Sequence, residues 1–199
     1  MSNPSDGIIK FNYACDNHNY IIPQSVYACL NPVRNILHNK GYIGVYSNGI
    51  SYGNISIRSV SSDAFFISGS NTGFLKTTHK RHYVKVTQCT PEENLLVYEG
   101  MGLPSSESLS HYIIYKHCSD AKAVIHIHNR ALWVQLKDKV ITSSPLVTYG
   151  SIEMCKELTS LFKNTPLAKE KILVMGGHED GIIVFGEDLR GCLGKILSM

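Results

Sequence analysis

The sequence contains few charged residues and no long apolar run. Asp, Glu, Lys and Arg make up 18% of its 199 residues, and the 19 basic residues are spread along the chain, which argues against a nucleic-acid partner. No run reaches the roughly 18 apolar residues of a membrane span, and the first residues lack the pattern of a signal peptide. We therefore expect a soluble, cytoplasmic protein with neither a nucleic-acid nor a membrane partner.

The cysteines show neither a C-x-x-C pair nor the compact framework of a small secreted domain. They are widely separated along the chain, at Cys15, Cys29, Cys89, Cys118, Cys155 and Cys192. Reduced thiols in a cytosolic protein are the simpler interpretation.

The rest of the composition is that of an ordinary globular protein. Hydrophobic residues make up 43% of the chain, with 16 glycines and 7 prolines. No repeat, low-complexity tract or linker interrupts the sequence, and its length suffices to bury a core. We therefore expect residues 1–199 to form a single domain.

Local signals predict alternating helical and extended segments. Asn31, Pro32 and Gly41 are placed as an N-cap, a first helical residue and a helix stop, so a helix is expected from about Pro32 to Asn39. Five β-branched and aromatic runs follow and predict strands: "YIGVYS", "NISIRSV", "AFFISG", "HYVKVTQC" and "NLLVYEG". A helix is expected near Ser106, then a strand in "AKAVIHIHNRALW", a helix in "IEMCKELTSLFK", strands in "KILVMGG" and "GIIVFG", and a final helix in "EDLRGCLGKILSM". This order predicts an α/β domain with helices flanking a mixed sheet.

Two histidines, His126 and His128, interrupt the apolar stretch "AKAVIHIHNRALW". Alternate side chains of a strand point to the same face, so both imidazoles share one face with Val124. Such a pair forms either two core histidines bound to protein groups or two ligands of a divalent metal that needs a third from elsewhere. His178 in "VMGGHEDG" is the candidate third ligand, because it follows a predicted strand and lies in a glycine-rich turn.

Two polar segments are candidate anion sites. Ser105, Ser106 and Glu107 precede an expected helix, whose free N–H groups and positive dipole end favour an anion. A serine cap with an acidic first turn explains the same residues. Gly53 and Asn54 in "SYGNISIR" either let the backbone approach a ligand closely or form an ordinary turn.

Five segments in order resemble the motif series of the class II aldolase and adducin family: "GNISIR", "FISGSNTG", "PSSESLSHYIIY", "AVIHIH" and "GGHEDGIIVFG". The resemblance extends from about Pro32 to Leu189. It implies a three-layer α/β/α sandwich around a mixed, mostly antiparallel central sheet. It also implies a homo-oligomer, usually a tetramer, with active sites at subunit interfaces.

The resemblance further implies a Zn²⁺ or similar divalent ion held by three histidines, which fall on His126, His128 and His178. Glu107 of "PSSE" falls on the carboxylate that acts as acid and base. The family's phosphate site falls on the "SGSNTG" loop, where Ser70 and Thr72 compete for one position, and on Gly53, Asn54, Ser105 and Ser106. The implied substrate is a small phosphorylated ketose or hydroxy ketone.

The same resemblance favours a metal-dependent lyase that cleaves a carbon–carbon bond through a metal-stabilised enediolate. The related aldolases carry glutamate at the position of Glu107, whereas the epimerases carry aspartate. A sugar phosphate dehydratase, a 4-epimerase and a non-catalytic adducin-like binding module are the alternatives. The segment after His128 is too short to hold the aldolases' catalytic tyrosine, and Tyr149 does not match that residue. Glu179 and Asp180 follow His178, where the family more often has glycine, and they either tune the metal or cap a turn.

Overall fold

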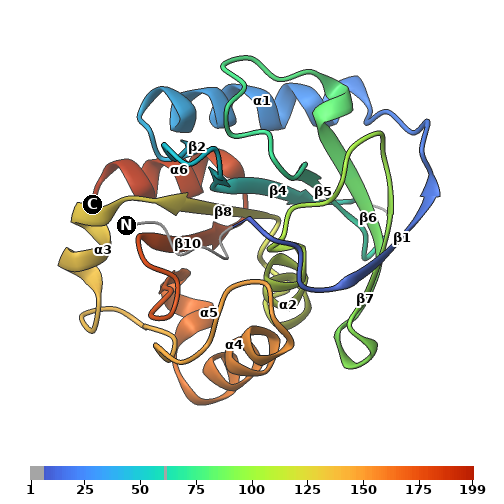
Figure 1. Ribbon diagram of the computed structural model, residues 1–199. Helices are drawn as coiled ribbons and strands as arrows, with labels where there is room; N and C mark the ends of the chain where they lie inside the picture. Colours follow the sequence, from blue (N-terminus) through green and yellow to red (C-terminus); the bar gives the residue numbers. More distant parts are fainter. Residues whose placement is uncertain (1–6, 61) are drawn as a thin grey trace.

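The computed structural model describes residues 7–60 and 62–199, and its centre is an eight-stranded sheet (Figure 1). The strand order is β1-β7-β6-β5-β4-β8-β10-β9. The pair β1–β7 is parallel and the other neighbours are antiparallel, which confirms the prediction of a mixed, mostly antiparallel sheet. The strands are β1 (Asn12–Asn17), β4 (Asn54–Arg58), β5 (Phe65–Ser68), β6 (Tyr83–Thr90), β7 (Leu95–Glu99), β8 (Ala123–His128), β9 (Ile172–Val174) and β10 (Gly181–Gly186).

Helices cover both faces of this sheet, giving the predicted three layers (Figure 1). One face carries α1 (Gln24–Asn39), α3 (Arg130–Leu136) and α6 (Leu189–Leu197). The other carries α2 (Ser108–His117), α4 (Ile152–Asn164) and α5 (Leu167–Glu170). Short 3-10 turns, η1 (Lys80–His82) and η2 (Pro91–Glu93), flank β6, and a small hairpin of β2 (Gly44–Val45) and β3 (Ser51–Tyr52) stands apart from the main sheet.

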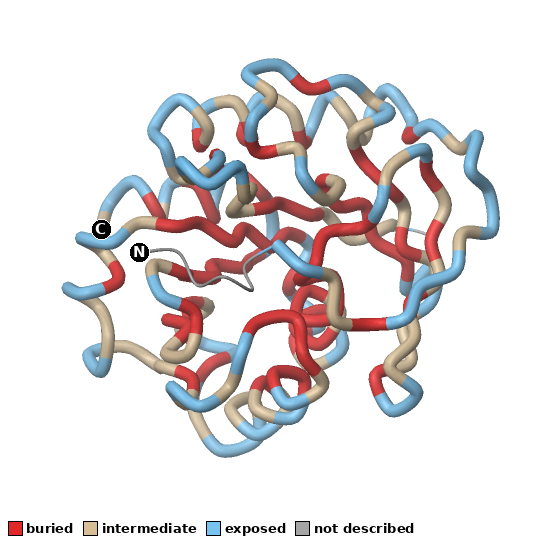
Figure 2. The backbone as a smooth tube through the Cα atoms, in the orientation of Figure 1, coloured by how far each residue is buried: buried red, intermediate tan, exposed pale blue. Residues whose placement is uncertain are grey.

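Strand β8 shows how the sequence pattern builds the two cores. Every residue of β8 is buried, and Figure 2 shows the central strands as the most buried part of the chain. Val124 packs with α2 and α4, whereas Ile125 and Ile127 pack with α1 and α6 on the opposite face. A fully buried Ile or Val stabilises the fold by roughly 1.5–3 kcal/mol, so this alternation fixes which face the two histidines share.

Several predicted boundaries are wrong. The first helix begins at Gln24, eight residues before Pro32, because Leu30 packs into the same core as Val33 and Leu37 and this burial outweighs the hydrogen bond lost at the internal proline. The run "YIGVYS" contributes only the two-residue β2, and "RALW" after the histidine strand is helical. Strand β1 and helix α5 were not predicted.

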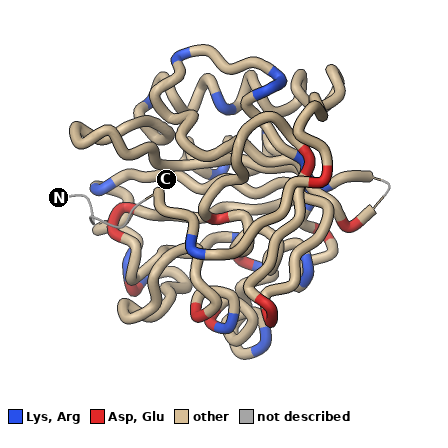
Figure 3. Tube along the Cα trace, turned by 45° about the vertical axis from the view of Figure 1, so that its right-hand side comes forward, with Lys and Arg blue, Asp and Glu red and all other residues tan. Residues whose placement is uncertain are grey.

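The basic residues do not gather in one part of the fold. Lys and Arg are spread over the upper and lower parts of the molecule in Figure 3. No helix in the described ranges is both long and apolar enough to cross a bilayer.

Candidate metal centre and cleft

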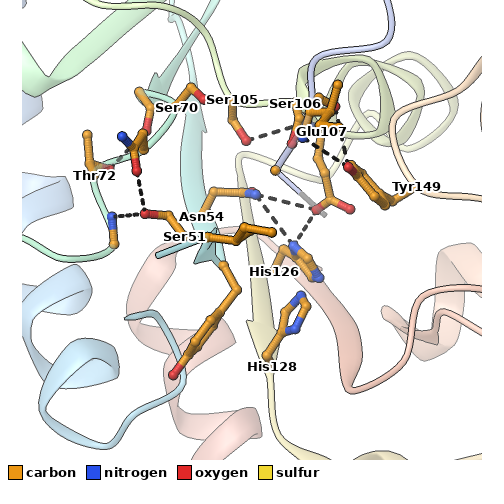
Figure 4. A pocket seen from close by; sticks show the side chains of 18 of the residues that line it. Ser51, Asn54, Ser70, Thr72, Ser105, Ser106, Glu107, His126, His128 and Tyr149 are labelled. Atoms are coloured by element: carbon orange, nitrogen blue, oxygen red, sulfur yellow. Dashed lines mark hydrogen bonds and ion pairs between the residues drawn. The ribbon is translucent and has the colours of Figure 1, made fainter. Parts of the chain in front are cut away.

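All ten residues predicted for the site line one cleft of about 400 Å³ (Figure 4). They come from segments distant in sequence: Gly53, Asn54, Ser70, Thr72, Ser105, Ser106, Glu107, His126, His128 and His178. The antiparallel sheet explains the convergence, because the start of β4, the end of β5, the end of β8 and the start of β10 lie at the same end of the sheet.

The three histidines form a compact buried group. His126 and His128 share one face of β8, and Gly181, at the start of β10, pairs with His128. His178 lies in the turn closed by the bond from Gly181 N–H to its carbonyl, so the register of β10 brings its ring to the pair. The Nε2 atoms of His128 and His178 are 3.0 Å apart, and one nitrogen from each ring fits within a 4.8 Å group.

This group suits a divalent transition metal. Two imidazole nitrogens that bind one tetrahedral zinc at about 2.0–2.1 Å lie about 3.3 Å apart, close to the spacing of His128 and His178. Nε2 of His126 is buried and has no hydrogen-bond partner among the described residues, as expected of a ring nitrogen whose lone pair binds a metal ion. Burial, aided by the other two rings, lowers the pKa of His128 well below its usual range, so that ring stays neutral.

Glu107 lies directly beside the histidines. Its Oε2 contacts Nδ1 of His126 and accepts a hydrogen bond from Nδ2 of Asn54 at 3.4 Å, as Figure 4 shows. Its Oε1 is 3.8 Å from Nε2 of His178 and accepts no hydrogen bond from any described residue. Burial alone would raise the pKa of Glu107. The pKa is nevertheless lowered to about 2, mainly by the charge and the hydrogen bond of His126, with smaller effects of His178 and His111.

His111 lies one helical turn after Glu107 and outside the metal group. Its Nδ1 is 2.7 Å from the hydroxyl of Ser56, which in turn is 2.7 Å from the hydroxyl of Tyr115. Its ring is fully buried, and its Nε2 has no partner in the described part of the chain. Burial lowers the pKa of His111 to about 3 despite the opposing charge of Glu107, so His111 stays neutral.

The other end of the cleft is built from backbone and hydroxyl groups. Gly53 has a φ of +73°, and a Cβ there would come within 2.8 Å of the Ile43 side chain, so the turn into β4 requires glycine. The hydroxyl of Thr72 donates to the carbonyl of Gly69 at 2.9 Å and thereby shapes its loop. The Ser105 hydroxyl accepts from the N–H of Glu107, and α2 begins only at Ser108 without a serine cap. The predicted helix start near Ser106 is therefore two residues too early.

Two side chains of α1 contact backbone carbonyls of the loop of residues 69–73. The buried Arg34 donates from Nη2 to the carbonyl of Thr72 at 2.9 Å, and Nε2 of His38 lies 3.1 Å from the carbonyl of Gly73. Gly73 itself packs so closely that a Cβ would lie 1.9 Å from the carbonyl of Gly44. These contacts fix the shape of residues 69–73, which we call the anion loop because Ser70 and Thr72, predicted for the phosphate site, lie in it.

Sequence reasoning missed the tyrosines of the site. The ring of Tyr149 packs at a tilt beside His178, with centroids 4.6 Å apart, and lines the cleft. It therefore belongs to the site although it does not match the family's tyrosine. Tyr46 and Tyr52 pack against His128. The position of Tyr52, directly before "GN", was the available signal, while Tyr46 and Tyr149 lie in turns without a recognisable pattern.

The two acids after His178 do not join the metal group. Glu179 is 46% exposed and pairs with Arg130, and Asp180 lies 3.3 Å from the same guanidinium. Of the two alternatives for these residues, the structure therefore favours a role in the surface turn.

The chain resembles a known family in sequence and in fold. A sequence profile for the Class II Aldolase and Adducin N-terminal domain matches residues 46–199. An L-fuculose 1-phosphate aldolase superposes with a TM-score of 0.67 at 19% identity, covering 90% of this chain and 83% of that one. No match was found among curated protein sequences.

Two further structures share the fold. YgbL from Klebsiella pneumoniae, for which aldolase, epimerase and decarboxylase activities are considered, has a TM-score of 0.65 at 16% identity and covers 88% and 84% of the two chains. A sugar-phosphate aldolase from Thermotoga maritima has a TM-score of 0.55 at 15% identity, with coverages of 84% and 91%. Since the profile spans most of the chain and the fold recurs in these structures, the chain belongs to the class II aldolase and adducin family.

Proposed function

We propose that this protein is a metal-dependent lyase that cleaves a carbon–carbon bond in a small phosphorylated ketose or hydroxy ketone. The observation that carries the proposal is the convergence of three buried histidines and a buried carboxylate at one end of a cleft whose other end is lined by hydroxyl and backbone groups. A non-catalytic binding module has no need to keep four ionisable groups out of water, because their burial is costly.

In this proposal His126, His128 and His178 hold a zinc-type ion. Three nitrogen ligands leave a coordination position open, as in catalytic zinc sites. When bound, such an ion polarises a carbonyl and stabilises the negative charge that develops when the neighbouring bond breaks.

Glu107 moves the proton. Its pKa of about 2 keeps it ionised at neutral pH, and Oε1 has no hydrogen-bond donor among the described residues. Oε1 therefore accepts the hydroxyl proton of the substrate as the carbon–carbon bond breaks, an aldehyde is released, and the bonding electrons stay on the ketone fragment. The proton then returns to that fragment from Glu107. Nδ2 of Asn54 donates to Oε2 and keeps the carboxylate oriented.

The anion loop, with Ser105 and Ser106, forms the proposed phosphate end. Neutral N–H and O–H donors orient a phosphate through directed hydrogen bonds. Binding far from the reacting bond places that bond beside Glu107.

We further propose a homo-oligomer, with a tetramer as the family expectation. Three apolar side chains are exposed near the anion loop, Phe74 (56%), Met101 (55%) and Leu103 (42%). The N–H of Ser70 donates to the carbonyl of Leu103, so these side chains belong to adjoining loops. Burial between copies would remove them from water.

The first test is metal analysis of the purified protein and of His126→Ala and His178→Ala, with His18→Ala as control because His18 is exposed. We expect one equivalent of divalent metal in the wild type and in H18A, and little in the other two variants. A wild type without stoichiometric metal would contradict the proposed centre.

The second test separates the reactions. Candidate ketose phosphates are incubated with the metal-loaded protein and with Glu107→Gln, and aldehyde release is followed by a coupled reductase. Aldehyde from the wild type alone supports cleavage. A product that is only an isomer identifies an epimerase, a product lacking water identifies a dehydratase, and no product with any ketose phosphate favours the binding module.

A further inference from the structure

Tyr46 reaches the candidate metal centre from outside the cleft. Its hydroxyl lies 2.5 Å from Nδ1 of His128, while Nε2 of the same ring faces His178 at 3.0 Å. Tyr46 is not among the described residues that line the cleft, whereas His128 and His178 are. The phenol therefore contacts the ring nitrogen of His128 that faces away from His178.

The short hairpin of β2 and β3 fixes this contact. The carbonyl of Tyr42, just before the hairpin, accepts a hydrogen bond from the N–H of His128 at 3.0 Å. Tyr46 N–H donates to the carbonyl of Ile50 at 2.9 Å, which closes the turn. The rings of Tyr46 and Tyr52 lie 4.5 Å apart, and both pack against His128. Backbone and ring contacts thus place the hydroxyl of Tyr46 on one nitrogen of one histidine.

The hydroxyl of Tyr46 can pair with either neutral tautomer of His128, but only one of them suits a metal ligand. A neutral imidazole carries one proton, and a metal binds the nitrogen that lacks it. If the proton is on Nδ1, it is donated to the Tyr46 oxygen and Nε2 presents a lone pair toward the metal group. If the proton is on Nε2, it blocks that position. An acceptor on the far nitrogen of a ligating histidine also fixes the ring orientation and raises its basicity.

We propose that Tyr46 is a positioning residue of the metal centre, accepting the Nδ1 proton of His128 so that Nε2 is held ready to bind the ion. This inference rests on the proposed metal centre and adds to it a tyrosine that belongs to this chain's own hairpin.

The test is Tyr46→Phe, which removes only the hydroxyl and keeps the ring. Tyr52→Phe is the matched control, because Tyr52 belongs to the same hairpin and also packs on His128, but its hydroxyl donates to the carbonyl of Gly41 at 3.2 Å. Zinc affinity is measured by competition with a chelating dye. We expect about 10- to 100-fold weaker zinc binding in Y46F and an unchanged affinity in Y52F.

A second readout separates positioning from general stability. In the zinc-loaded, ¹⁵N-labelled wild type and Y52F, the Nδ1 proton of His128 is expected as a downfield resonance that exchanges slowly with solvent, and in Y46F it is expected to be lost to exchange. The metal-free thermal midpoints of both variants should agree. Y46F with wild-type zinc affinity and a persistent resonance would overturn the inference while leaving the centre intact. Absence of stoichiometric zinc from the wild type would overturn the centre and this inference together.

Discussion

Replacing the buried His111 is expected to change how the stability of the metal-free protein depends on pH. His111 is fully buried in α2, hydrogen-bonded to Ser56, and has a pKa of about 3 instead of the usual 6.5. Asparagine at this position keeps a polar group near the Ser56 hydroxyl but cannot take up a proton in this pH range. The variant His111→Asn therefore removes one titration and leaves the neighbouring polar contact possible.

The sign and size of this change in stability follow from the pKa of His111 in the folded and in the unfolded chain. Because the folded-state pKa lies below the unfolded one, the unfolded chain binds more protons, and the stability that is present above pH 6.5 is lost as the pH falls towards 3. One such group costs about 2 kcal/mol between pH 7 and pH 5, with a limiting slope of about 1.4 kcal/mol per pH unit. His128, whose pKa is also lowered by burial, acts in the same direction, whereas the titration of Glu107 lies below this window.

The assay is urea unfolding at pH 7, 6 and 5 with a chelator present, so that no metal competes with protons. The wild type should lose at least about 2 kcal/mol from pH 7 to pH 5, and H111N should lose about 2 kcal/mol less than the wild type. The absolute stability of H111N at pH 7 is not the measured quantity, since the substitution also leaves a cavity. If H111N lost as much stability as the wild type over this range, His111 would not be a neutral buried group. Replacing the exposed His18 by Asn serves as the control and should leave the wild-type dependence unchanged.

Three further changes have defined outcomes. Gly53→Ala should lower the free energy of unfolding in urea by about 2–4 kcal/mol, because the added Cβ would lie 2.8 Å from the Ile43 side chain. The control Gly49→Ala, at φ +83° with open space around it, should lower it by only about 1 kcal/mol. Equal losses in the two variants would show that the contact with Ile43 is unimportant. Glu107→Gln should retain the metal by elemental analysis and lower kcat by about 10²- to 10⁴-fold, and loss of the metal would contradict a proton-transfer role. Arg34→Met should weaken inhibition by inorganic phosphate about tenfold at unchanged kcat, since the Thr72 carbonyl in the anion loop loses its donor. Unchanged inhibition would show that Arg34 does not support the phosphate end.

The sequence predicted those parts of the site whose side chains are set by strand periodicity or by an ordered motif. His126 and His128 share a face because strand side chains alternate, and that geometry needs no tertiary information. His178 was named from its place after a predicted strand in a glycine-rich turn and from the family resemblance, but the register of β10 against β8 that groups it with the pair could not be predicted from the sequence. The structure places these residues together, and their chemical roles stay predictions.

The missed features depend on contacts between segments distant in sequence. Helix α1 extends back to Gln24 because Leu30 reaches the core that also holds Val33, and no local capping signal marks that start. Strand β1 is the parallel neighbour of β7, a pairing more than 80 residues apart along the chain, and most of its side chains are exposed. Tyr46 approaches His128 across 82 residues from a two-strand hairpin of which the sequence predicted only one strand, in "YIGVYS".

The proposed phosphate end of the cleft has no basic residue, and the charge of a bound metal ion would compensate for this. Glu107 is the only acid among the described cleft-lining residues, and no Lys or Arg is among them. A bound divalent ion would add two positive charges to this lining, and at a separation of about 8 Å each unit of charge contributes about 2 kcal/mol to the binding of an anion in a medium of effective dielectric constant near 20. The ion would therefore supply attraction that a lysine supplies in other phosphate sites, while hydroxyl and N–H groups supply direction. A permanent cation in the anion loop would instead attract phosphate to the metal-free protein, whereas neutral donors would make the proposed phosphate binding depend on the loaded centre.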